Sequence, residues 1–77
     1  MKVIRHVVFR GRVQGVGFRA FVEAEAARGA VEGWVRNRRN GAVEALFAGE
    51  LALVDAVIAA CRRGPHSARV DGVEERE

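Results

Sequence analysis

The sequence has 77 residues, of which 49% are hydrophobic and 30% are charged, and its formal net charge is +3. This composition excludes a disordered tail, and the length allows one domain, residues 1–77, that buries about 60% of its unfolded surface. The positive charge is compatible with a nucleic acid, an anionic surface or a small anionic substrate, and it does not choose among them.

The N-terminal third of the chain is predicted to form a strand followed by a helix. Residues 3–9 are rich in β-branched side chains and too few for a helix, so they predict a strand that ends at Gly11. From Phe18 to Ala26 apolar residues recur every four positions, which predicts one face of a helix. Gly29 supplies a stop signal for this helix.

The middle of the chain is predicted to form a β-hairpin. Residues 31–36 and 42–48 have the composition of strands, and the segment 37–41 between them ends in Asn40-Gly41. This dipeptide tolerates the positive φ angles of a tight turn. We therefore expect the two strands to be antiparallel neighbours.

A second helix and a last strand are predicted for the C-terminal part. The helix opens after Gly49, carries apolar residues at helical spacing as far as Cys61, and ends at Gly64-Pro65. Residues 68–73 are predicted to form the last strand.

The order β-α-β-β-α-β predicts an α+β fold of the ferredoxin-like type. In this split βαβ arrangement, a two-layer sandwich, both helices cover one face of an antiparallel or mixed sheet. The same fold carries many functions, so it assigns no activity by itself.

The segment between the first strand and the first helix, residues 11–19, can bind an anion. Gly11, Gly15 and Gly17 allow positive φ angles, so that successive N–H groups can converge on one point. The helix that follows adds its own free N–H groups and the positive end of its dipole. Arg19, in its first turn, can bind two phosphate oxygens at once.

This segment alone is a weak signal of an anion site. We give about even odds to the alternative, which is a tight turn that lies beside a surface arginine and binds nothing. Its glycines are spaced differently from the dinucleotide fingerprint G-x-G-x-x-G. It also lacks the Gly-Lys-Ser/Thr ending of a Walker A loop.

Two segments resemble the signature sequences of the acylphosphatase family. They are Gly-Arg-Val-Gln-Gly-Val-Gly-Phe-Arg at residues 11–19 and Gly-Trp-Val-Arg-Asn at residues 33–37, and the eighteen residues from Arg19 to Asn37 match the family's spacing. The resemblance extends over residues 7–74. It implies a small metal-independent hydrolase that splits acyl phosphates, which are carboxyl-phosphate mixed anhydrides, into a carboxylate and inorganic phosphate.

The resemblance also implies roles for particular residues. Arg19 would bind the phosphoryl group and Asn37 would orient the attacking water. The backbone cradle for the phosphate would comprise Gln14, Gly15, Val16, Gly17, Phe18 and Arg19. No cofactor or metal is expected, and the rate should vary little between about pH 5 and 8 because no residue is assigned a proton-transfer role.

The sequence departs from the family pattern at three places. The hairpin has Asn40-Gly41 where the family commonly has Asp-Gly, which preserves the turn chemistry. Gly29-Ala30 reverses the usual apolar-then-Gly order, which puts the helix cap in question. The last residues, 73–77, lack the apolar strand residues that many relatives carry, so we expect a frayed end and a less stable domain.

Three other functions were weighed against this interpretation. A carbamoyl-transfer enzyme of hydrogenase maturation shares the loop, but its relatives usually read Phe-Arg-Pro-Phe where residues 18–21 are Phe-Arg-Ala-Phe. An RNA-binding module of the same fold would need aromatic residues on its central strands, and neither residues 3–9 nor 42–48 supply such a stretch. Only activity separates the enzyme from a non-catalytic anion-binding module.

The remaining reactive side chains are interpreted as structural or solvated. Cys61 lies on the apolar stripe of the second helix and has Ser67, not an arginine, six positions later. His6 and His66 are far apart in the sequence and no carboxylate cluster accompanies either one, which disfavours a metal site and a phosphohistidine nucleophile.

The sequence gives no indication of secretion or membrane insertion. No apolar run near the N-terminus is followed by a small-residue cleavage site, so no secretory signal is predicted. The longest apolar region, residues 51–61, is short and interrupted by Asp55, so no membrane span is predicted. A lone cysteine is consistent with a reducing compartment. We therefore expect a cytoplasmic monomer that acts on a small-molecule acyl phosphate and binds neither membrane nor nucleic acid.

Overall fold

The computed structural model describes residues 1–77 and contains four strands and two helices. In chain order these are β1 (Lys2–Arg12), α1 (Phe18–Arg28), β2 (Glu32–Asn37), β3 (Val43–Glu50), α2 (Leu51–Arg63) and β4 (Arg69–Arg76). The predicted order of elements is therefore confirmed. Neither helix is long and apolar enough to cross a membrane.

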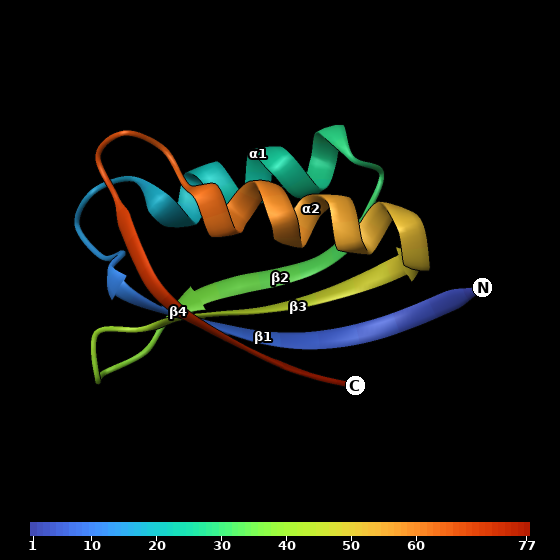
Figure 1. Ribbon diagram of the computed structural model, residues 1–77, viewed down its shortest axis with the longest axis horizontal. Coiled ribbons are helices and arrows are strands. Elements are labelled where there is room, and N and C mark those ends of the chain that lie inside the picture. Colours follow the sequence, from blue (N-terminus) through green and yellow to red (C-terminus); the bar gives the residue numbers. More distant parts are fainter.

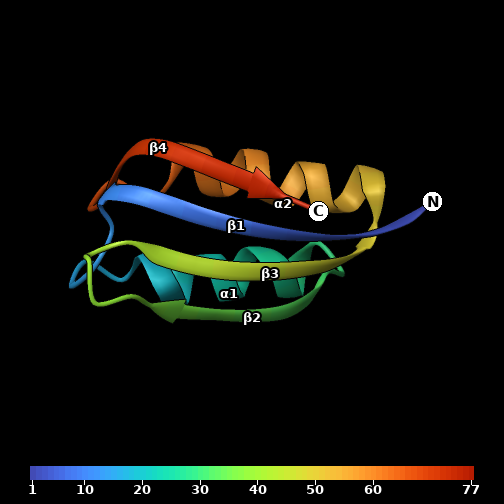
Figure 2. The same ribbon diagram turned by 90° about the horizontal axis from the view of Figure 1, so that it is seen from below.

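The sheet has the strand order β2-β3-β1-β4, and every neighbouring pair is antiparallel. Because β3 separates β1 from β2, these two strands run in the same direction and α1 crosses over between them. The two helices lie in one layer on one face of the sheet (Figures 1 and 2). This is the predicted ferredoxin-like sandwich, with an antiparallel sheet.

The core lies between the helices and the sheet. Alternate residues of β1, such as Val7 and Phe9, are fully buried and face the helices. Phe9 meets Phe18 of α1 edge to face, with ring centroids 5.2 Å apart. Cys61 is also fully buried, and burial raises the pKa of its thiol to about 12. The thiol therefore stays protonated, which confirms the interpretation of Cys61 as a core residue.

Two element boundaries differ from the sequence prediction. Strand β1 continues through Gly11 to Arg12, with a change of register between Arg10 and Gly11 where it pairs with β4. Strand β4 does not fray after residue 73 but runs to Arg76, which pairs with His6. Its end is held by backbone pairing to β1 and by ion pairs. These join Arg10 to Glu74 and Arg62 to Glu75.

The end of α1 also differs from the prediction. The left-handed position, with φ 57°, falls on Ala30, one residue after Gly29. Gly29 is needed for another reason, because a Cβ atom there would lie 2.6 Å from Cγ2 of Val57 in α2. The glycine therefore allows the helices to approach closely, while an alanine takes the strained angle.

A cluster of charged side chains occupies the face of the sheet that the helices leave open. The buried carboxylate of Glu44 accepts hydrogen bonds from Nε2 of His6 and, at 2.6 Å, from Nε of Arg36. These bonds, His6 first and Arg36 second, lower the pKa of Glu44. The Arg36 guanidinium also lies 5.2 Å from the ring centroid of Trp34. His6 is thus part of a structural hydrogen-bonded cluster with Glu44 and Arg36.

Candidate active site

The glycine-rich loop turns sharply between β1 and α1. Val13 anchors it in the core, with 1% of its surface exposed. Gly15 and Gly17 follow with φ angles of 72° and 79°, and Gly17 is the N-cap of α1. Alternating left-handed glycines in such a loop turn successive amides toward one side, which forms a concave site for an anion.

The backbone N–H groups of this loop have no acceptor within the protein. None of those from Gln14 to Ala20 donates a hydrogen bond, and the first N–H to do so is that of Phe21, to the Gly17 carbonyl at 3.1 Å. No side chain caps α1, and no acidic residue lies in its first turn. The loop and helix end therefore present free donors and a positive dipole at one place.

Arg19 and Asn37 meet at this place. A surface pocket of about 310 Å³ is lined by both side chains together with Gly15 and Gly17. Arg19 comes from the first turn of α1 and Asn37 from the last residue of β2. Arg19 makes no ion pair or hydrogen bond within the protein. Its positive charge is thus available to a ligand.

The other residues around the pocket restrict its chemistry. The remaining lining residues are Val13, Phe18, Ala20 and Glu23. Glu23 is the only carboxylate among them, and no histidine, cysteine or lysine lines the pocket. Among the predicted backbone donors, Gln14 and Val16 do not line it. No cluster of three or more histidine, cysteine, aspartate or glutamate side chains is suited to hold a metal ion anywhere in the chain.

The side chain of Gln14 connects the loop to the hairpin that follows Asn37. Its Nε2 donates hydrogen bonds to the carbonyl oxygens of Arg38, at 2.6 Å, and Ala42, at 2.8 Å. From the sequence, only a backbone role is expected for Gln14. Its side chain is a mechanical link between the two halves of the site, and no local pattern in the sequence indicates its partners.

Ser67 holds the loop from the opposite side. Its Oγ donates a hydrogen bond to the carbonyl oxygen of Val16 at 2.8 Å, from the connection between α2 and β4. Because the C=O and N–H of a trans peptide point in opposite directions, this bond directs the N–H of Gly17 away from Ser67. No local pattern in the sequence indicates this contact either, because it joins residues 51 positions apart.

Comparison with known proteins identifies the family. The acylphosphatase family model matches residues 5–77. This chain belongs to the acylphosphatase family. An acylphosphatase of Rhodopseudomonas palustris strain BisB18 is 60% identical over 74 residues, which are 96% of this chain and 75% of that protein. The crystal structure of acylphosphatase from Bacillus subtilis is 36% identical with a TM-score of 0.93, over 99% of this chain and 83% of that one.

A further similar structure is part of a much larger protein. Full-length HypF in its phosphate- and nucleotide-bound form is 31% identical with a TM-score of 0.92, over the whole of this chain but only 10% of HypF. Membership of the acylphosphatase family makes this chain an enzyme that hydrolyses acyl phosphates. None of these matches favours a non-catalytic anion-binding or RNA-binding module.

Proposed function

We propose that the loop amides and Arg19 bind the phosphoryl group of an acyl phosphate while Asn37 orients the water that attacks it. The observation that carries this proposal is the convergence of Arg19, Asn37 and the glycines of the loop on one pocket. The backbone donors there are unpaired, as an anion site requires.

Arg19 and the loop amides neutralise the phosphoryl oxygens. The planar guanidinium binds two oxygens, and the preorganised N–H groups bind the others as negative charge shifts in the transition state. Removing one donor of this kind typically costs about 2.7 to 4 kcal/mol of transition-state stabilisation. Since Arg19 has no carboxylate partner, it makes this contact without first breaking an ion pair.

The leaving group needs no strong general acid. The water oxygen bonds to phosphorus, the bond between phosphorus and the acyl oxygen breaks, and a carboxylate departs whose conjugate acid has a pKa of about 4. One proton of the water stays on the attacking oxygen and the other passes to a phosphoryl oxygen, which gives dihydrogen phosphate. The amide of Asn37 offers an acceptor and two donors but does not act as a base. Its contribution is the placement of the nucleophile, as in other phosphoryl transfers that use an amide side chain.

We also propose how the enzyme acts with respect to metals, cofactors, compartment and oligomeric state. Charge neutralisation by Arg19 and backbone amides replaces a metal ion, so we propose metal-independent hydrolysis without a cofactor. The free, buried Cys61 is consistent with a reducing compartment, and we propose a cytoplasmic monomer with a small-molecule acyl phosphate as its partner.

Hydrolysis of benzoyl phosphate in the presence of a chelator tests the proposal. We expect the native chain to turn over, and Arg19→Ala and Asn37→Ala to lower kcat/KM by roughly 100-fold or more. Arg39→Ala is the matched control, because it removes an exposed arginine that makes no ion pair and lies outside the pocket. Native activity in folded Arg19→Ala or Asn37→Ala, or a native chain inactivated by the chelator, would overturn the proposal.

A further inference from the structure

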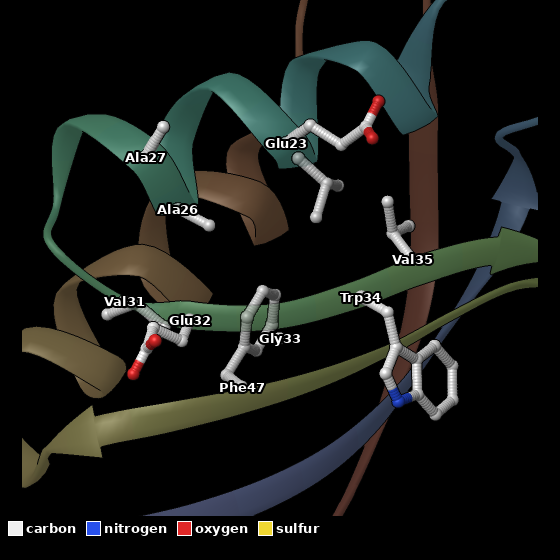
Figure 3. A pocket seen from close by; sticks show the side chains of 10 residues that line it. Glu23, Ala26, Ala27, Val31, Glu32, Gly33, Trp34, Val35 and Phe47 are labelled. Atoms are coloured by element: carbon white, nitrogen blue, oxygen red, sulfur yellow. The ribbon is translucent and has the colours of Figure 1, made fainter.

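We propose that an apolar groove between α1 and β2 binds the acyl group of the substrate and favours acyl phosphates whose acyl group is neutral and apolar. This inference rests on the function proposed above. The groove has a volume of about 410 Å³, within the range typical of small-molecule sites. Its apolar lining includes Val22, Ala26, Ala27, Val35 and Phe47 (Figure 3).

The groove begins where the phosphate pocket ends. Glu23 lines both, and it lies one helical turn after Arg19 on the same face of α1. On the opposite wall, Val35 lines the groove and Asn37 lines the pocket, two residues further along the same face of β2. A substrate held by its phosphoryl end can therefore extend its acyl group directly into the groove.

Small side chains keep the groove open. Ala26 and Ala27 form its wall on α1, and Gly33 on β2 adds no side chain to the lining. A Cβ atom at Gly33 would clash with the carbonyl oxygen of Leu46 in β3, so the close approach of the two strands requires the glycine. The large ring of Trp34 points to the other side of the sheet, away from α1 (Figure 3). The buried side chains of Val22 and Phe47 form an apolar floor. Alkyl or aryl groups gain free energy by covering such a surface.

The charges around the groove oppose an anionic acyl group. Glu23 and Glu32 line it, and no arginine or lysine does. The Glu23 carboxylate extends toward the N-terminal end of α1, where the groove meets the phosphate pocket (Figure 3). A free carboxylate at the far end of the acyl chain would be repelled by this like charge, whereas a neutral chain would not.

The position of the groove agrees with the geometry of the reaction. In-line displacement requires the water and the departing carboxylate on opposite sides of phosphorus. Asn37 lies beyond Val35 along β2, so an acyl group in the groove leaves the Asn37 side of the phosphorus to the water.

The ratio of kcat/KM for hexanoyl phosphate to that for acetyl phosphate tests the groove, because it cancels effects on the shared phosphoryl group. We expect a ratio of roughly 10 for the native chain, since the additional methylene groups cover apolar surface that acetyl does not reach. Ala27→Phe should lower the ratio at least fivefold by filling the groove. Ala24→Phe, at an exposed position of α1 that does not line the groove, should keep the native ratio.

Glu23→Gln provides a second test that does not add volume. It should raise kcat/KM for succinyl phosphate, relative to hexanoyl phosphate, by about threefold to tenfold. A native ratio of hexanoyl to acetyl near one, or an unchanged ratio in Ala27→Phe, would overturn the acyl groove and leave the proposed function standing. A native chain that hydrolyses none of these substrates would overturn the proposed function, and the acyl groove with it.

Discussion

Two loops that contain left-handed glycines lie side by side and differ in how many of their backbone amides are hydrogen-bonded. In the β2–β3 turn, the N–H groups of Arg38, Gly41 and Ala42 find acceptors within the turn, at 2.8 to 3.2 Å, and those of Arg39 and Asn40 do not. In the loop before α1, no N–H from Gln14 to Ala20 finds one. Glycine therefore makes a turn possible in both loops, and it is the continuous run of unpaired amides before α1 that suits an anion.

The largest expected difference between the two loops is the effect of a methyl group on activity. Gly17 and Gly41 have φ angles of 79° and 93°, and a Cβ atom at either position meets nothing within 4 Å. Gly17→Ala and Gly41→Ala should therefore each lower the free energy of unfolding by about 1 to 2 kcal/mol through backbone strain alone. Only Gly17→Ala should lower kcat/KM, by roughly 100-fold, because relief of the strain rotates a cradle amide.

Urea unfolding and benzoyl phosphate hydrolysis measure these two quantities separately. The activity assay is made at a temperature where both variants are folded. Equal losses of activity in Gly17→Ala and Gly41→Ala would show that the loop amides have no special role. Native activity in folded Gly17→Ala would lead to the same conclusion.

A smaller effect is expected when the link between the loops is cut. Gln14→Ala removes both hydrogen bonds to the hairpin, so the cradle and Asn37 lose their fixed spacing. We expect kcat to fall about tenfold, as a loss of positioning would cause. Gln14→Glu keeps the size of the side chain but not its donors, and it should have a similar effect.

Asn40→Ala is the matched control for this link, because the side-chain Oδ1 of Asn40 accepts a hydrogen bond from the Ala42 N–H within the turn itself. It should lower the free energy of unfolding by about 1 kcal/mol and leave kcat near the native value. Steady-state kinetics and urea unfolding of the three variants check both quantities. A kcat loss in Asn40→Ala equal to that in Gln14→Ala would assign the effect to turn stability, not to the link.

The fold was predicted from the sequence because it depends on local patterns, and local patterns also singled out two residues that the structure brings to one pocket. Helical spacing and the Asn40-Gly41 turn act over a few residues, and the order of elements then leaves few arrangements of the sheet. Arg19 and Asn37 could be proposed because each belongs to a motif of contiguous residues. Their convergence on one pocket follows from β1 and β2 running in the same direction, with α1 crossing over between them.

The features that were missed depend on contacts between distant segments. The Ser67–Val16 hydrogen bond joins residues 51 positions apart, and the Gln14 side chain reaches carbonyl groups 24 and 28 positions away. Every residue has a backbone carbonyl oxygen, so the residue types in the sequence cannot indicate which carbonyl accepts such a hydrogen bond. The groove beside Ala27 was missed because it depends on how α1 and β2 pack together. Small side chains line it, and the ring of Trp34 points to the side of the sheet away from α1.

Stability should depend on pH through Glu44, which does not line the phosphate pocket, whereas activity should not. Hydrogen bonds from His6 and Arg36 lower the pKa of Glu44, so the folded state favours the ionised carboxylate. The resulting stability is present above the pKa of Glu44 in the unfolded chain and is lost as the pH falls through its lowered pKa in the folded state. Glu44→Gln should remove a contribution on the order of 1 kcal/mol, while kcat stays flat between about pH 5 and 8.

Urea unfolding between about pH 7 and 3 measures this contribution. The difference between the native chain and Glu44→Gln should shrink as the pH falls. Glu32→Gln, which removes a glutamate that makes no ion pair, should follow the native curve. A constant difference over the whole range would mean that Glu44 does not titrate as the structure indicates.

The smallest effect is expected at Ala30, a left-handed residue that does not line the phosphate pocket. Ala30 has a φ angle of 57°, which is strained for alanine. Ala30→Gly relieves this strain but also gives the unfolded chain more freedom, so the net gain in the free energy of unfolding should be about 0.5 kcal/mol. That gain would raise Tm by about 2 to 4 °C in a domain of this size.

The preceding residue supplies the opposite control for Ala30→Gly. Gly29→Ala places a methyl group against Val57 and should lower Tm, although it adds an alanine at an ordinary φ angle of −85°. Neither variant should change kcat/KM for benzoyl phosphate, because neither residue lines the phosphate pocket. A lower Tm in Ala30→Gly would mean that the contacts of its methyl group outweigh the strain. Left-handed geometry would then be a poor guide to stability in this chain, and the activity of Gly17→Ala would have to be interpreted without it.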